Sequence, residues 1–67
     1  MRKITSRERL LENILLIVRK NPGIRASKIN RKLNREHTWS YRKTLIERGL
    51  IRKEKDGIAV RYYPVNR

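Results

Sequence analysis

The spacing of the apolar residues changes at Gly49, and this change limits the folds that the chain can adopt. Before Gly49, apolar residues recur every three or four positions, as they do along one face of an α-helix. After it, the runs 50–55 and 58–63 have the alternating pattern of half-buried strands. The 67-residue sequence therefore predicts an α+β fold, mainly α, with helices first and a β-hairpin last.

A first helix is expected to begin at Thr5 or Ser6, because Thr5 and Glu8 have the spacing of a capping box. The segment 21–23 (Asn-Pro-Gly) ends it, since proline cannot continue the helical hydrogen bonds and glycine accepts a left-handed conformation. The arc that this helix would bury contains Leu10, Leu11, Ile14, Leu15, Ile17 and Val18. Leu16 lies on the opposite arc, where it is either a partner contact or an ordinary exposed leucine.

A short second helix is expected where Ala26, Ile29 and Leu33 share one face. The outward side of this helix carries Ser27, Lys28 and Arg31. Arg25 precedes it and is a poor N-cap, because its side chain cannot accept a hydrogen bond from the first amides. The segment 34–37 then breaks the helical pattern.

A third helix is expected from Glu36 or Thr38 to Arg48, with Gly49 as its C-terminal stop. Its buried arc contains Tyr41 and Leu45, and the margins of that arc are Thr38, Arg42 and Ile46. Its outward arc contains Ser40, Lys43 and Glu47. Trp39 lies between the two arcs, so a core or half-buried aromatic and a base-stacking group are both open interpretations.

The dipeptide Asp56-Gly57 is expected to form the two-residue turn of the hairpin, because both positions tolerate a positive φ. That turn predicts one face made of Ile51, Lys53, Lys55, Ile58, Val60 and Tyr62. Pro64 is expected to close the second strand at a sheet edge, where the missing amide donor is harmless.

The chain carries 19 Lys and Arg against 6 Asp and Glu, a formal net charge of +13. Every segment contributes to this excess, so the charge is not a tail attached to a neutral domain. We expect one domain over residues 1–67, with short flexible ends near 1–4 and 65–67. A polyanionic partner, above all nucleic acid, fits this charge.

Composition also excludes several classes of protein. The chain has no cysteine, which rules out disulfide bonds, thiolate metal sites and a cysteine nucleophile. The longest apolar run, 14–18, is far shorter than the roughly 20 residues of a membrane-spanning helix. The N-terminus has no secretory pattern. We expect a cytoplasmic, nucleoid-associated protein without membrane contact.

Three stretches resemble one family: NPGIRASKI at 21–29, Leu33-Asn34, and LIERGLIR at 45–52. They are similar to winged helix-turn-helix transcription regulators of the bacterial and archaeal MarR and ArsR kind, over roughly residues 10–64. The resemblance implies three helices followed by a two-stranded β-hairpin wing. It also implies binding of double-stranded DNA, with the third helix in the major groove and the wing on the backbone or an adjacent groove.

The candidate DNA contacts follow from this arrangement. Base-edge or groove contacts are expected from Arg35, His37, Ser40, Lys43 and Thr44, on or beside the outward face of the third helix. Phosphate contacts are expected from Lys28, Arg31, Arg42, Lys53, Lys55 and Arg61. The alternative for each charged side chain is an ordinary solvated surface position. The family's long C-terminal dimerisation helices have no counterpart here, so a homodimer would use the first helix, at Leu16, or the wing.

No residue cluster indicates catalysis. His37 is the only histidine and the acids are scattered, so no metal site is expected. Glu8 and Glu12 lie one helical turn apart among arginines, which indicates ion pairs rather than an acid–base pair. We expect no enzyme and no cofactor. Two functions remain besides sequence-specific regulation: a non-specific DNA- or RNA-binding or architectural protein, and a winged helix that docks onto other proteins.

Overall fold

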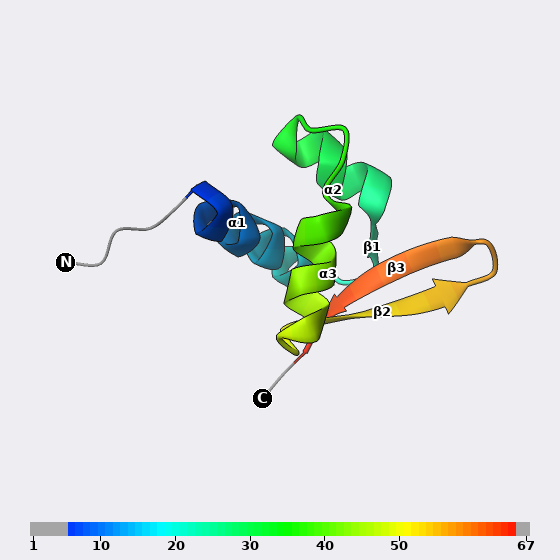
Figure 1. The fold of residues 1–67 in the computed structure, drawn as a ribbon. Coiled ribbons are helices and arrows are strands. Elements are labelled where there is room, and N and C mark those ends of the chain that lie inside the picture. Colours follow the sequence, from blue (N-terminus) through cyan, green and yellow to red (C-terminus); the bar gives the residue numbers. More distant parts are fainter. Residues whose placement is uncertain (1–5, 66–67) are drawn as a thin grey trace.

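The computed structural model describes residues 6–65 and shows three helices and three strands in an α+β fold (Figure 1). In chain order the elements are α1 (Ser6–Lys20), β1 (Ile24–Arg25), α2 (Ala26–Leu33), α3 (Trp39–Glu47), β2 (Ile51–Asp56) and β3 (Ala59–Pro64). The strands form one antiparallel sheet in the order β1-β3-β2. In Figure 1, α3 lies in front of the centre and the β2–β3 hairpin projects to the right of the helices.

The two-stranded hairpin expected from the sequence is therefore incomplete, because β1 adds a third strand. Ile24 pairs with Tyr62 and Arg25 pairs with Arg61, which makes β3 the central strand. A strand of two residues is too short to show an alternating pattern, so the sequence carried no signal for it. Pro64 ends this central strand and does not lie on an edge strand, contrary to the sequence-based expectation.

The core lies where α1, α2 and α3 meet the sheet. Its buried side chains include Leu11, Ile14 and Val18 from α1, with Ile29, Leu45, Ile51 and Tyr62 from the other elements. The predicted arc of α1 is confirmed, since Leu15 and Ile17 pack at its border and Leu16 is 50% exposed on the other side. The core face of α2 is confirmed as well.

The ends of α2 are as the sequence predicts. Arg25 makes no capping hydrogen bond with its side chain in the described structure, so α2 begins without a side-chain cap. Asn34 ends the helix in the left-handed region with φ 54°. Thr5, half of the expected capping box, lies outside the described residues, as do the expected flexible ends apart from Val65. The Val65 amide donates to the Leu50 carbonyl at 3.0 Å.

The turn of the hairpin is Gly57-Ile58 and not Asp56-Gly57. Asp56 pairs with Ala59, which shifts every cross-strand partner by two positions from the predicted register. Gly57 has φ 64°, and Ile58 has no positive φ, as a type II′ turn requires. Because the shift is even, the predicted face survives: Lys53 still shares a face with Tyr62, and Lys55 now pairs with Val60.

Candidate nucleic-acid interface

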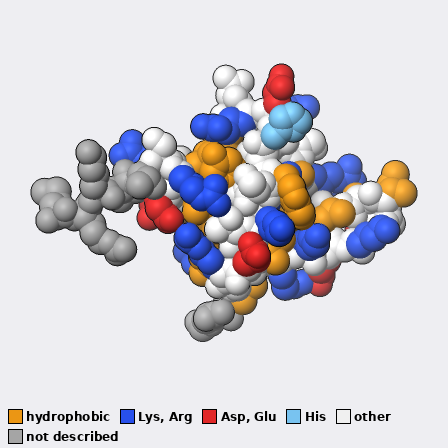
Figure 2. Space-filling view, viewed as in Figure 1, with side chains coloured by type: hydrophobic (Ala, Val, Ile, Leu, Met, Phe, Trp, Pro, Cys, Tyr) orange, Lys and Arg blue, Asp and Glu red, His pale blue; other side chains and the backbone are white. Residues whose placement is uncertain are grey.

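The exposed face of α3 is the part of the structure best shaped to enter a groove of a nucleic acid. Leu45 and Arg42 are buried on the inner side of α3, which leaves Ser40, Lys43 and Glu47 exposed on the outer side. Figure 2 views the molecule from this side and shows blue basic side chains around the position of α3, with few red acidic ones. The outward positions expected for Ser40 and Lys43 are confirmed.

One flank of this face is made by α1. The Arg7 guanidinium donates to the Thr44 hydroxyl at 2.9 Å, and that hydroxyl donates to the Ser40 carbonyl at 2.9 Å. Arg7 also lies over the Tyr41 ring, 5.3 Å from its centroid. Thr44 is half-buried, and its hydroxyl is already engaged in two hydrogen bonds. Arg7 places a cation at the edge of α3, and this residue was not among the predicted DNA contacts.

The opposite flank is made by the hairpin. Trp39, the first residue of α3, is 49% exposed, and the Lys53 ammonium lies 5.1 Å from the centroid of its ring. Lys53 reaches Trp39 because it pairs with Tyr62 and so lies on the sheet face that meets the helices. Trp39 is thus a half-buried aromatic at the surface, beside a cation, and Lys53 borders α3 as well as the hairpin.

Arg42 does not have the phosphate-contacting position expected from the sequence. Its side chain is only 8% exposed. Its Nε donates to the Thr38 hydroxyl at 3.0 Å and its Nη1 donates to the Tyr62 hydroxyl at 2.5 Å. The guanidinium also lies against the rings of Trp39 and Tyr62, at 5.4 and 5.3 Å from their centroids. Arg42 therefore holds α3 against the sheet and is not available at the surface.

Arg35 and His37 lie in the segment between α2 and α3. Arg35 is exposed and lines a small hollow against α1, together with Ser6, Arg9 and Asn13. Arg35 therefore borders α1. His37 is exposed directly before α3 begins. His37 is thus near the end of α3 that carries Trp39, and Arg35 belongs to a separate part of the surface.

The basic residues of the hairpin divide between its two faces. Lys55 is exposed on the face that carries Lys53, beside the partly exposed Val60. Arg61 lies on the other face, where it donates to the Gly23 carbonyl at 3.0 Å and pairs with Asp56 at 3.3 Å. Ile58, in the turn, is fully exposed. Only Lys53 and Lys55 therefore share the side of α3.

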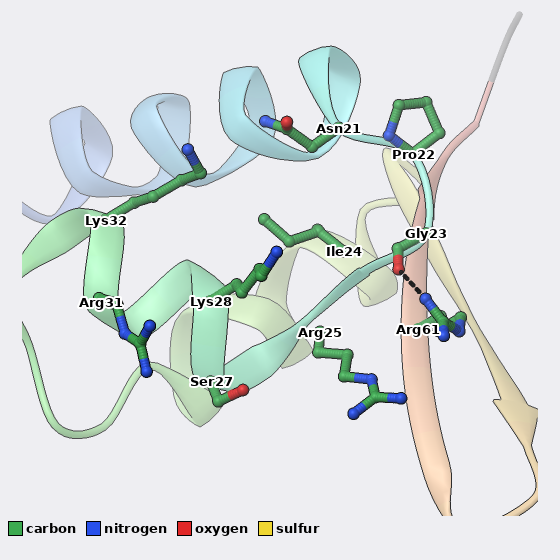
Figure 3. Close-up of a pocket in the computed structure, with 10 residues that line it drawn as sticks. All are labelled: Asn21, Pro22, Gly23, Ile24, Arg25, Ser27, Lys28, Arg31, Lys32 and Arg61. Atoms are coloured by element: carbon green, nitrogen blue, oxygen red, sulfur yellow. Dashed lines mark hydrogen bonds between the residues drawn. The ribbon is translucent and has the colours of Figure 1, made fainter.

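Lys28 and Arg31 are exposed on α2, as predicted, but they lie around a different feature. Figure 3 shows them beside an open hollow between α2, β1 and the hairpin. The other cations at this hollow are Arg25, Lys32 and Arg61. The predicted phosphate contacts thus fall into two groups, one beside α3 and one around this hollow.

An ion pair joins the far end of α3 to α1. Arg48 donates to Glu8 at 3.1 Å, and both side chains are about half exposed. The hydrogen bond and the charge of Glu8 raise the pKa of Arg48 above its ordinary value. Within residues 6–65 no cluster of three or more His, Asp or Glu side chains could hold a metal ion. No helix among them is long and apolar enough to span a membrane.

Comparisons with protein-family models, with curated proteins and with solved structures find no match to this chain. The candidate interface is therefore defined by its own geometry. It consists of the outer face of α3, flanked by Arg7 on the α1 side and by Trp39 and Lys53 on the hairpin side. We call this surface the α3 face.

Proposed function

We propose that the chain is a sequence-specific double-stranded DNA-binding protein of the winged helix-turn-helix type that acts as a transcriptional regulator. The observation that carries the proposal is the α3 face itself. An exposed helix presents Ser40 and Lys43 outward, and a cation lies on each side of it, Arg7 and Lys53. An α-helix with its side chains fits the width of the B-DNA major groove.

The outward side chains suit the chemistry of base edges. The Lys43 ammonium can donate to the O6 and N7 acceptors of guanine, and the Ser40 hydroxyl can donate or accept. Glu47, on the same side, can accept from the amino group of cytosine. These side chains would supply the sequence preference, since contacts with phosphates carry no direct sequence information.

The flanking cations suit the two phosphate strands that border a groove. Arg7 and Lys53 are held beside aromatic rings, so their positions are restricted before DNA arrives. Lys55 continues this row along the hairpin, which would follow the backbone or the adjacent groove. A homodimer through Leu16 on α1 or through the hairpin would place two α3 faces on a pseudo-palindromic site. Such a protein would act in the cytoplasm, on the nucleoid.

The second candidate is a non-specific DNA- or RNA-binding or architectural protein. The observation in its favour is that basic side chains are not confined to the α3 face but also surround the hollow beside α2. A winged helix that docks onto proteins is a weaker alternative, because a net charge of +13 favours a polyanion.

A competition titration tests the proposal. A duplex selected from a random pool should bind about 10³-fold or more tightly than random duplex at the same salt concentration. The double variant Ser40→Ala/Lys43→Ala should lose this preference, whereas Lys20→Ala, which removes one exposed charge from α1, should keep it. Equal affinity for random duplex, single strand and RNA, with only a steep salt dependence, would refute the proposal in favour of the non-specific alternative.

A further inference from the structure

The hollow beside α2 is a second concentration of positive charge. It has a volume of about 790 Å³ and lies between α2, β1 and the base of the hairpin (Figure 3). Its basic lining residues are Arg25, Lys28, Arg31, Lys32 and Arg61. No Asp or Glu is among the described residues that line it. Arg61 is paired with Asp56 outside the lining, and the field inside the hollow is set mainly by the other four cations.

Two of the cations at the hollow, Arg25 and Arg61, lie on the face of the sheet opposite to the one that meets α3. Arg25 pairs with Arg61, so the two side chains share one face. Tyr62, the next residue along β3, points to the other face, where it is buried and accepts a hydrogen bond from Arg42 of α3. Lys53 shares that other face and contacts Trp39. One straight duplex lying on the α3 face would thus leave Arg25 and Arg61 free for another ligand.

The hollow is partly ordered before any ligand binds. Arg61 is fixed at one side, because it donates to the Gly23 carbonyl at 3.0 Å, as the dashed line in Figure 3 marks. Lys28 and Lys32 lie one turn apart on α2 and so present two like charges in a row. A bound anion would relieve this repulsion.

We infer that the hollow binds the phosphodiester backbone of a second nucleic-acid segment, so that one molecule can bridge two duplexes. The inference rests on the proposed function, which gives the α3 face the first duplex. The cations of the hollow are spread over an open surface, and their contacts with phosphates carry no direct sequence information. Binding at the hollow is therefore independent of sequence and strongly dependent on salt.

A backbone fits this hollow better than a compact small anion does. Four of its five cations, Arg25, Lys28, Arg31 and Lys32, are on exposed side chains spread along α2 and β1. A small anion would need these long side chains to converge on one point and lose their rotamer freedom. A backbone carries a charge at every nucleotide and can meet the cations where they stand.

A capture experiment tests the inference. One duplex is immobilised, a second carries a fluorophore, and the protein is added at fewer molecules than duplexes. The hollow variant is Lys28→Gln/Lys32→Gln, and the matched control is Arg9→Gln/Arg19→Gln, which removes two exposed charges from α1 outside the hollow. Anisotropy of a single labelled duplex reports binding at the α3 face separately for every variant.

The wild-type protein and the control should capture the second duplex, and the hollow variant should not. In the single variants Lys28→Gln and Lys32→Gln, the salt dependence of capture should fall by about 0.9 log units per log unit of salt, the effect of one lost phosphate contact. Single-duplex binding should remain the same in the hollow variant as in the control. Capture that the hollow variant and the control share equally would overturn the inference and would indicate a dimer with two α3 faces. A wild-type protein that binds one duplex and captures no second would also overturn it, and the absence of any duplex binding would overturn the proposed function as well.

Discussion

The Arg42 guanidinium donates a hydrogen bond to the Tyr62 hydroxyl at 2.5 Å and so joins α3 to the central strand of the sheet. The same guanidinium donates to Thr38, whose hydroxyl donates to Asn30 of α2. Asn30 in turn donates to the Glu36 carbonyl at 3.1 Å. A chain of polar contacts thus connects α2, α3 and β3 beneath the α3 face and holds α3 against the sheet.

Tyr62→Phe removes the acceptor of this network and leaves a buried guanidinium short of one partner. We expect the variant to lose about 1–3 kcal/mol of unfolding free energy, the usual effect of an unsatisfied buried polar group. Urea unfolding followed by circular dichroism measures it. Tyr63→Phe is the control, because Tyr63 lies on the other face of the sheet against Arg52. Equal losses in the two variants would contradict the role given to Arg42.

The order of elements could be read from the sequence because helix periods, glycine stops and turns are local signals. Gly49 ends α3 and Asn34 ends α2 within a residue or two of the expected positions. The third strand could not be predicted, since β1 exists only through its pairing with β3. The predicted register of the hairpin was wrong. Both Asp56-Gly57 and Gly57-Ile58 can form a two-residue turn, and the structure adopts the second.

The outward face of α3 was also a local prediction, and Ser40 and Lys43 lie on it. The flanks of this face could not be predicted from local sequence signals. Arg7 and Thr44 are separated by 37 residues, and they meet only because α1 packs on α3. Arg42 was misassigned because a long side chain on the margin of a buried arc can turn toward solvent or toward the core. Here the side chain turns toward the core, because the hydroxyls of Thr38 and Tyr62 accept its hydrogen bonds and the Tyr62 ring packs against its guanidinium.

Arg7 should contribute to duplex binding if it borders the groove. Arg7→Gln should reduce the salt dependence of binding by about 0.9 log units per log unit of salt, the effect of one lost phosphate contact. Arg9→Gln is the matched control, since Arg9 is exposed on α1 and makes no hydrogen bond or ion pair with α3 among the described residues. Anisotropy titrations between 50 and 200 mM salt (roughly the range over which such slopes are measured) give both values. Identical slopes for the two variants would exclude Arg7 from the interface.

Trp39 is the only tryptophan in the chain, so its fluorescence reports on one site. Its ring is half exposed beside Lys53, and phosphates should draw this lysine away from the ring. We therefore expect saturating duplex to shift or quench the emission, and Lys53→Gln to reduce the change. An emission spectrum unaffected by saturating duplex would show that DNA does not reach this flank.

The Arg48–Glu8 pair should stabilise the fold slightly and without pH dependence from Arg48 near neutrality. The pKa of Arg48 is raised, so its contribution is complete below the ordinary pKa of arginine and is lost only as the pH rises through the raised value. Glu8→Gln should lower the melting temperature at low salt, and the difference should shrink at high salt because the pair is half exposed. A difference that does not depend on salt would point to packing instead of charge.

Methylation interference at guanine N7 tests whether α3 lies in the major groove, because this atom is exposed in that groove. A duplex with the selected sequence is methylated sparsely, and the fractions bound by wild-type protein and by Lys43→Ala are compared. Methylation of specific guanines should block binding of the wild-type protein, and methylation of at least one of these guanines should no longer block binding of Lys43→Ala. Binding that is indifferent to N7 methylation at every guanine would contradict the placement of α3 in the major groove.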